Sequence, residues 1–269
     1  MKTSFYGIGL LFVLPLAVVA AACGRDKPAE PAPAASPALL APSAPSTAPP
    51  SPRVRYIERM TGGATTSDAV PLVLAIHGYG DRPESFGRYF ERLPVRARLV
   101  LPYALFPRDG GGFYWFPLAN FEPKALADGM SDAANALAEM LSEIEKTRPL
   151  EGKPIVTGFS QGGMLSFSLA VLHPDRVGEA IPVAGMLASP LFPSSWPMGK
   201  VAPPILAFHG DADDIVDIAG DRDTVNALSK VGFSAKLTEY PNVRHAVSAD
   251  MHRDWMAAIE AAVKRAAGR

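Results

Sequence analysis

The sequence has very little cysteine and no excess of charge of either sign. Cys23 is the only cysteine among 269 residues, so no disulfide can form within one chain. The 26 lysines and arginines nearly balance the 27 aspartates and glutamates, and no run of basic residues forms a stripe. Without such a stripe the chain lacks the electrostatic footprint of a nucleic-acid-binding protein. We therefore expect no nucleic-acid partner and a small molecule or a lipid as the substrate.

The first 22 residues have the features of a signal peptide. Lys2 supplies positive charge, and residues 8–22 form an apolar run that is short for a transmembrane helix, which needs roughly twenty apolar residues. Small residues precede Cys23, which resembles the lipobox of bacterial lipoproteins, although alanine stands where leucine is usual. This resemblance implies a lipid anchor on Cys23 in the cell envelope. The alternative is cleavage at an Ala-x-Ala site, which would release a soluble periplasmic protein.

Residues 23–52 begin with Cys23 and continue as a spacer of proline, alanine and serine. Such a composition cannot bury enough apolar surface to offset the entropy of ordering, and its prolines favour extended conformations. We expect a semi-rigid tether here, followed by one globular domain over residues 53–269.

Within that domain, short apolar segments alternate with longer segments of helical periodicity. This alternation predicts an α/β fold with a mostly parallel sheet and helices on both faces. Strands are expected at residues 54–60, 72–76, 97–101, 155–159, 180–183, 205–209 and 235–240. Their continuous hydrophobicity is typical of strands covered on both sides. The clearest helices carry apolar stripes from Leu126 to Ile144 and over residues 249–267.

The segment GFSQG at residues 158–162 is a G-x-S-x-G motif between a predicted strand and an apolar helical pattern. A serine on a sharp strand-to-helix turn is held in a strained conformation, and glycines two positions away remove side chains that would clash. The following helix presents free N–H groups to developing negative charge. We therefore predict Ser160 as a nucleophile; an ordinary turn is the alternative.

Three segments together resemble the carboxylesterase and phospholipase-type family of small α/β-hydrolases, which includes the acyl-protein thioesterases. They are GFSQGGM at residues 158–164, AIHGYGD at residues 75–81 and AFHGDADDIV at residues 207–216, in the family's order. The likeness extends from about residue 71 to the C-terminus. It implies an α/β-hydrolase fold and a serine esterase that needs no cofactor and no metal.

A serine nucleophile needs a base, and histidine is suited to that role near neutral pH. His245 lies between the last predicted strand and the last helix, where the resemblance places the base, and His252 is the alternative. His77 and His209 precede glycine at strand ends and are expected to shape turns. His173 precedes a proline and is expected to cap a helix.

The resemblance also implies an acid four residues after the histidine of the third motif, which is Asp213. Its neighbour Asp214 is the alternative. A metal-binding acidic loop is a further reading, but the segment lacks the alternating ligands and the closing glutamate of an EF-hand loop. We therefore expect no metal.

Negative charge on the substrate's carbonyl oxygen needs fixed N–H donors. The predicted donors are the backbone N–H groups of Gln161, which follows the nucleophile, and of Tyr79, to which the resemblance points. Glycines on both sides of Tyr79 allow the backbone to approach a substrate closely. A plain glycine turn is the alternative at this second position.

Residues 102–123 form a long irregular segment, and such segments in compact domains are usually functional. Its aromatic residues, including Phe113 and Trp115, follow three glycines at 110–112. They either serve the substrate, as an acyl-binding groove or as a mobile lid on a glycine hinge, or form a buried plug. Met186 begins a second stretch that departs from the family. We predict Phe113, Trp115 and Met186 as substrate-binding residues.

These observations predict a serine hydrolase that cleaves carboxylic esters through an acyl-enzyme. Thioesters share the same geometry, so thioester hydrolysis at the same site is one alternative. A surface lipoprotein that binds without turnover is the other.

Overall fold

The computed structural model describes residues 54–118, 122–197, 199 and 201–268. The predicted signal peptide, Cys23 and the spacer lie outside these residues. Among the described residues, no helix has both the length and the apolar character to span a membrane.

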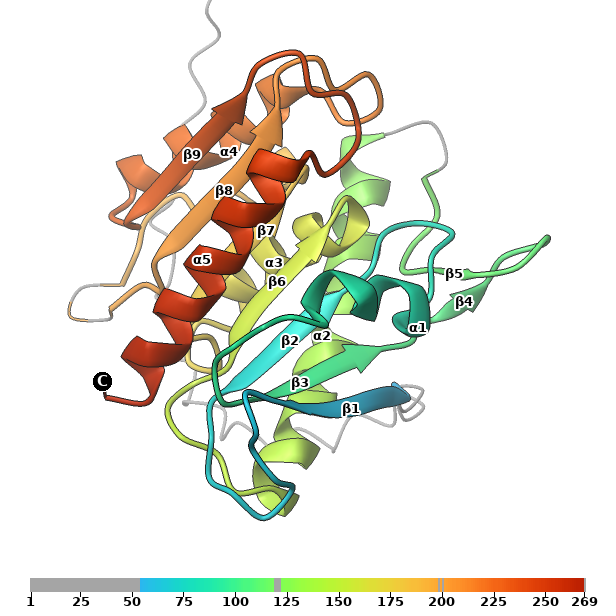
Figure 1. Ribbon diagram of the computed structural model, residues 1–269. Helices are drawn as coiled ribbons and strands as arrows, with labels where there is room; N and C mark the ends of the chain where they lie inside the picture. The colour runs from blue at the N-terminus through green and yellow to red at the C-terminus, as the bar shows by residue number, and fades with distance from the viewer. Residues whose placement is uncertain (1–53, 119–121, 198, 200, 269) are drawn as a thin grey trace, which may run out of the picture. The chain divides into compact units, whose positions relative to one another are not determined.

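A seven-stranded sheet forms the middle layer of the domain, in the order β1-β3-β2-β6-β7-β8-β9 (Figure 1). The strands are β1 (Tyr56–Thr61), β2 (Leu72–Ile76), β3 (Ala97–Pro102), β6 (Ile155–Phe159), β7 (Glu179–Val183), β8 (Ile205–Gly210) and β9 (Ala235–Tyr240). Strand β1 is antiparallel to β3, and the other neighbouring pairs in this sheet are parallel. Every residue of β2, β3 and β7 is buried, as continuous hydrophobicity predicts.

Helices cover both faces of the sheet (Figure 1). They are α1 (Pro83–Phe86), α2 (Pro123–Thr147), α3 (Gln161–Leu172), α4 (Ile218–Lys230) and α5 (Ala249–Ala266), with the short 3₁₀ helices η1 (Gly87–Phe90) and η3 (Ser189–Leu191). Buried residues of α2, α3 and α4 form one hydrophobic core with one side of the sheet. Buried residues of α1, η1 and α5 form a second core with the other side. The predicted α/β architecture is confirmed.

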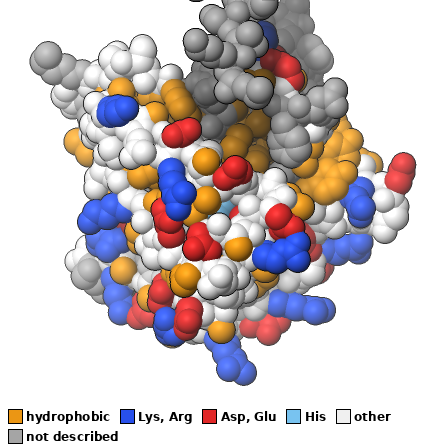
Figure 2. Space-filling view, turned by 90° about the horizontal axis from the view of Figure 1, so that it is seen from above, with side chains coloured by type: hydrophobic (Ala, Val, Ile, Leu, Met, Phe, Trp, Pro, Cys, Tyr) orange, Lys and Arg blue, Asp and Glu red, His pale blue; other side chains and the backbone are white. Residues whose placement is uncertain are grey.

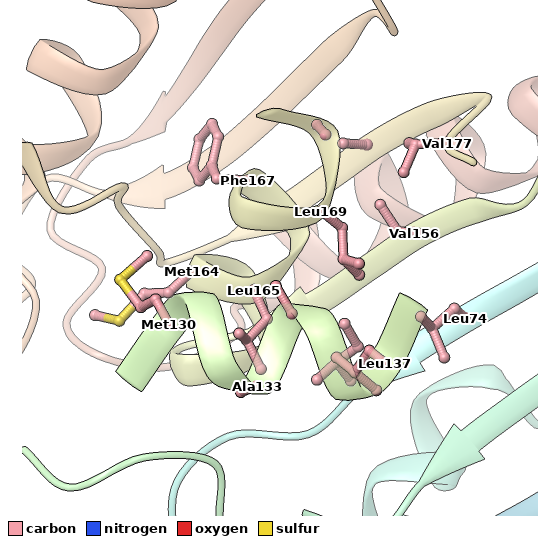
Figure 3. Packing of buried hydrophobic residues seen from close by; sticks show 14 of the residues in the cluster. Leu74, Met130, Ala133, Leu137, Val156, Met164, Leu165, Phe167, Leu169 and Val177 are labelled. Carbon is pink, nitrogen blue, oxygen red and sulfur yellow. The ribbon is translucent and has the colours of Figure 1, made fainter. Parts of the chain in front are cut away.

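Helix α3 lies between the sheet and α2, where its side chains are almost fully buried. Figure 3 shows Met164 and Leu165 of α3 packed close to Met130 and Ala133 of α2. Helix α2 starts at a cap, because the carboxylate of Glu122 accepts two backbone N–H groups of the first turn. This packing fixes the start of α3, and with it the turn that carries Ser160.

Candidate active site

The predicted site residues gather at one edge of the sheet. The arrowheads of β6, β8 and β9 point toward the same edge (Figure 1). Ser160 directly follows β6, Asp213 lies in the loop after β8, and His245 lies in the loop after β9. Loops at the carboxyl ends of parallel strands are where ligands bind in open α/β sheets.

The turn at Ser160 is strained and has no room for larger flanking residues. Ser160 has φ 57° and ψ −117°, a backbone conformation that non-glycine residues rarely adopt. A Cβ atom on Gly158 or Gly162 would lie 2.4 Å or 1.9 Å from the carbonyl oxygen of Ile76. The Ser160 N–H donates to the carbonyl of Val183 at 3.0 Å, which holds the turn against β7. These contacts agree with the prediction that side chains at positions 158 and 162 would clash in this turn.

A continuous line of hydrogen bonds joins Ser160, His245 and Asp213. The Oγ of Ser160 lies 2.9 Å from Nε2 of His245, and Nδ1 of the same ring lies 2.7 Å from Oδ2 of Asp213. Ser160 is 8% exposed, whereas the side chain of Asp213 is fully buried. The aromatic ring of Phe159 lies against the imidazole, with ring centroids 4.8 Å apart. The arrangement matches the geometry of an activated serine nucleophile.

The two alternative residues lie away from this line. Nε2 of His252 hydrogen-bonds the carbonyl of Tyr89 at 2.9 Å. Asp214 instead pairs at the surface with Arg244, and this hydrogen bond lowers the pKa of the Asp214 carboxyl. The structure therefore brings together His245 and Asp213 rather than their alternatives.

The two predicted oxyanion donors lie on two segments close to the nucleophile. Gln161 is the first residue of α3, so its N–H has no partner within the helix. Tyr79 lies in the loop after β2, where a Cβ atom on Gly78 would come within 3.2 Å of the Ser160 Cβ. Within the described chain, no hydrogen bond uses the N–H of Gln161 or of Tyr79. Both groups are therefore available to a substrate oxygen.

Buried hydrogen bonds tie these two segments together. The side chain of Gln161 accepts the N–H of Trp115 at 2.9 Å and donates to the carbonyl of Phe116 at 2.7 Å. The indole N–H of Trp115 then donates to the carbonyl of His77 at 2.9 Å. All four residues are buried. The start of α3 is thus connected to the Tyr79 loop through Trp115.

This position of Trp115 corrects the sequence analysis. Trp115 was predicted to contact substrate, but its side chain is 0% exposed and belongs to the main core. A large apolar ring with an N–H donor is stable inside the protein when that donor has a partner, as it has here. Of the two alternatives for the aromatic segment, the buried plug describes Trp115 and Phe116.

The other two predicted substrate-binding residues are half-buried. The ring of Phe113 packs edge-on against Tyr103, 5.4 Å between centroids. Met186 lines a pocket of about 170 Å³ together with Leu126 and Phe192. A contact of either residue with substrate stays a prediction.

The hairpin formed by β4 (Phe106–Pro107) and β5 (Phe113–Tyr114) is not among the elements predicted from the sequence. It borders a cleft of about 680 Å³ whose lining includes Tyr79, Arg108, Tyr114 and Leu118. The Tyr79 and Tyr114 rings lie 5.5 Å apart, and the Arg108 guanidinium lies 5.6 Å from the centre of the Tyr79 ring. Figure 2 shows hydrophobic side chains gathered on the side where Figure 1 places this hairpin. The three consecutive glycines before Phe113 were the available sequence signal.

In the part of the chain that the structure describes, no group of three or more histidine, cysteine, aspartate or glutamate side chains is arranged to hold a metal ion.

A sequence model of the phospholipase/carboxylesterase family matches residues 64–262. The chain belongs to this family. Acyl-protein thioesterase 1 of Debaryomyces hansenii is 28% identical over 224 residues, which are 75% of this chain and 95% of that protein. Lysophospholipase-like protein 1 of Mus musculus is 28% identical over 121 residues, 44% of this chain and 50% of that protein. The resemblance drawn from the three motifs is confirmed.

Solved structures show the same fold. Esterase PE8 superimposes with a TM-score of 0.67 at 24% identity. The superposition covers 78% of this chain and 99% of the esterase chain. Zea mays acyl-protein thioesterase 2 has a TM-score of 0.63 at 22% identity with the same coverage. The α/β-hydrolase fold of this family member is thereby established.

The buried hydrogen bonds of the Gln161 side chain give a stability prediction. Gln161→Leu leaves the buried N–H of Trp115 and the carbonyl of Phe116 without partners, at a cost of about 1–3 kcal/mol for each buried group. We expect a clear decrease in the free energy of unfolding, measured by urea denaturation. Asn135→Leu is the matched control, because Asn135 bonds His173 at an exposed position. A Gln161→Leu protein as stable as this control would contradict a stabilising role of the Gln161 hydrogen bonds.

Proposed function

We propose that this family member is a serine hydrolase that cleaves carboxylic esters, with Ser160 as nucleophile, His245 as general base and Asp213 as the acid that orients His245. The observation that carries the proposal is the hydrogen-bonded line from Asp213 through His245 to Ser160 on a strained turn. Backbone strain of this kind persists only where the surrounding structure holds it, and it concentrates at active sites.

The first half of the reaction forms an acyl-enzyme. Oγ of Ser160 attacks the ester carbonyl carbon while Nε2 of His245 takes the hydroxyl proton. The buried Asp213 carboxylate stabilises the resulting imidazolium through its bond to Nδ1. The N–H groups of Gln161 and Tyr79 donate to the tetrahedral oxyanion. Each such donor contributes roughly 3–4 kcal/mol to lowering the barrier.

The second half releases the acid. His245 gives its proton to the alcohol oxygen, the carbon–oxygen bond of the ester breaks, and the alcohol leaves. A water molecule then attacks the acyl carbonyl while His245 takes one of its protons. Collapse of this second intermediate returns the proton to Oγ of Ser160 and frees the carboxylic acid. Every proton is carried by His245, so the cycle needs no cofactor.

The cleft beside Tyr79 supports a small-molecule or lipid ester as substrate. Its wall includes Tyr79, whose N–H is a proposed oxyanion donor, so the cleft shares one residue with the proposed site. A volume of about 680 Å³ is within the range of pockets for small ligands, roughly 300–1,000 Å³. Apolar contacts come from Leu118 and Pro117, and Tyr114 adds an aromatic face.

Thioester hydrolysis is a second candidate, and it is favoured by the similarity to a protein named acyl-protein thioesterase 1 over 75% of this chain. The same serine attack applies, with a thiol as leaving group. Parallel assays on an oxygen ester and a thioester of the same acyl group separate the two. A higher kcat/KM for the thioester would favour the second candidate.

The nucleophile is tested by Ser160→Ala. We expect kcat for p-nitrophenyl ester hydrolysis to fall by about 10³-fold or more, because no other group can form the acyl-enzyme. Ser166→Ala is the control: it removes a buried hydroxyl from the same helix that bonds only the carbonyl of Gly162. Equal turnover by Ser160→Ala and Ser166→Ala would remove the basis of the proposal.

Substitution of two adjacent aspartates tests which of them orients His245. Asp213→Asn should lower kcat by about 10³–10⁴-fold, because the amide no longer stabilises the imidazolium or fixes its tautomer. Asp214→Asn should retain activity, since it alters only the surface pair with Arg244. Steady-state kinetics of both variants provide the measurement. A large loss in Asp214→Asn alone would reassign the acid.

We also propose that Cys23 carries a lipid that tethers the enzyme to the cell envelope, as the lipobox-like segment suggests. The full chain expressed in a bacterial host should incorporate a fatty-acid label and sediment with membranes. Cys23→Ala should lose both properties, because the anchor is removed. Release of the unaltered chain without label would instead favour cleavage as a soluble protein.

A further inference from the structure

Two ionisable residues lie fully buried behind the acid of the site. His209, near the end of β8, and Asp221, in the first turn of α4, are both 0% exposed. Nδ1 of His209 lies 2.9 Å from Oδ2 of Asp221. The expectation that His209 only shapes a turn therefore omits its main contact.

The contacts of His209 determine where its protons lie. Nε2 is 2.9 Å from the carbonyl oxygen of Val216, which can only accept, so Nε2 carries a hydrogen. The same nitrogen is 3.3 Å from Oδ2 of Asp213. A second proton is shared between Nδ1 and the Asp221 carboxylate. Either position of that shared proton leaves the pair neutral overall, with the Nε2–H donated to Val216 and lying beside Asp213.

Burial of the Asp221 carboxyl group costs free energy of solvation, which apolar packing does not offset. Among the described contacts, its Oδ1 has no hydrogen-bond partner. Burial raises the pKa of Asp221 to about 6 against the opposing bond from His209, and the charge of Glu239 adds to the rise. Burial disfavours charged His209, but the bond and charge of Asp221, the Val216 carbonyl and the charge of Asp213 together outweigh burial and raise the pKa of His209. Both shifts keep the shared proton in the pair.

Asp213 receives donors on both of its oxygens. Oδ1 accepts the backbone N–H groups of Ile215 and Val216, each at 2.9 Å. Oδ2 lies between Nδ1 of His245 at 2.7 Å and Nε2 of His209 at 3.3 Å. The His209 imidazole therefore lies beside the same oxygen that bonds His245, while its Nε2–H donates to Val216.

We propose that His209 and Asp221 are positioning residues for catalysis: Asp221 and the Val216 carbonyl hold the ring of His209, and the Nε2–H of His209, beside Oδ2, partly neutralises Asp213. This inference rests on the proposed function, because it concerns the same triad. It extends the line of contacts to Ser160–His245–Asp213–His209–Asp221.

The His209 N–H also affects the charge of Asp213. A donor beside Oδ2 withdraws negative charge from the carboxylate that bonds His245. Glu239 is a further charged group near the pair, and it is bound to Arg222 at the surface. Loss of the His209 N–H beside Asp213 should therefore move the acidic limb of the rate profile to higher pH.

Two variants of Asp221 test the proposal. Asp221→Ala removes the partner of Nδ1, so the ring of His209 loses one of the two bonds that hold it beside Asp213. We expect the acidic limb of kcat/KM to rise by about one pH unit and kcat to fall about tenfold, as for loss of an outer-shell partner, with KM unchanged. Asp221→Asn should restore the wild-type profile, because its amide N–H can donate to Nδ1 while Nε2 keeps its hydrogen.

A wild-type profile in folded Asp221→Ala, or equal shifts in both variants, would overturn the proposal. A measurement on the unaltered domain covers the case in which Asp221→Ala does not fold. In ¹⁵N-histidine NMR spectra His209 should keep a protonated Nε2 across neutral pH, and an unprotonated Nε2 would overturn the proposal. Ser160→Ala is assayed in parallel. If the unaltered enzyme and Ser160→Ala are equally inactive, the proposed function fails, while the NMR result still decides the His209 tautomer.

Discussion

The strained turn at Ser160 is the constraint on which the rest of the site depends. Its positive φ is held from two directions: by the N–H bond to Val183 of the neighbouring strand, and by α3, which starts at Gln161. Helix α3 cannot shift, because it is buried between the sheet and α2. Gly158 and Gly162 then allow the turn to pass within contact distance of β2. The hydrophobic core thus maintains a conformation that the isolated peptide would not adopt.

The site is then completed by polar groups whose partners are all inside the protein. One set of buried hydrogen bonds runs from Gln161 through Trp115 to His77 and holds the oxyanion side. A second runs from His245 through Asp213 toward the buried pair behind it. Both sets lie inside the protein, away from bulk water. In the protein interior hydrogen bonds are electrostatically stronger, and rotation of a side chain is restricted. Preorganisation of this kind lets donors stabilise charge without reorganising during the reaction.

The sequence could predict the elements with strong periodicity and the residues tied to a motif. The strands at residues 72–76 and 155–159 were predicted with the bounds that the structure gives, and the long helix α2 was found from its apolar stripe. Ser160, His245 and Asp213 could be named because each follows a strand in a recognisable segment. The hairpin of β4 and β5 could not, because two-residue strands leave no periodicity to detect.

Residues whose role depends on tertiary contacts also could not be assigned from the sequence. An aromatic residue in a glycine-rich loop fits a groove and a plug equally well, and only the bonds of Trp115 to Gln161 and His77 decide between them. Asp221 is separated from His209 by eleven residues and a helix start, so nothing in the local pattern pairs them. Such pairs appear only when β8 and α4 are brought together.

The central claim is that Ser160 is activated as a nucleophile by His245. The most direct measurement is covalent labelling of the folded domain with a fluorophosphonate, followed by mapping of the modified peptide by mass spectrometry. We expect one adduct on Ser160 and a greatly slowed reaction in His245→Ala. Labelling of another serine, no labelling of a well-folded domain, or equally fast labelling of His245→Ala would contradict it.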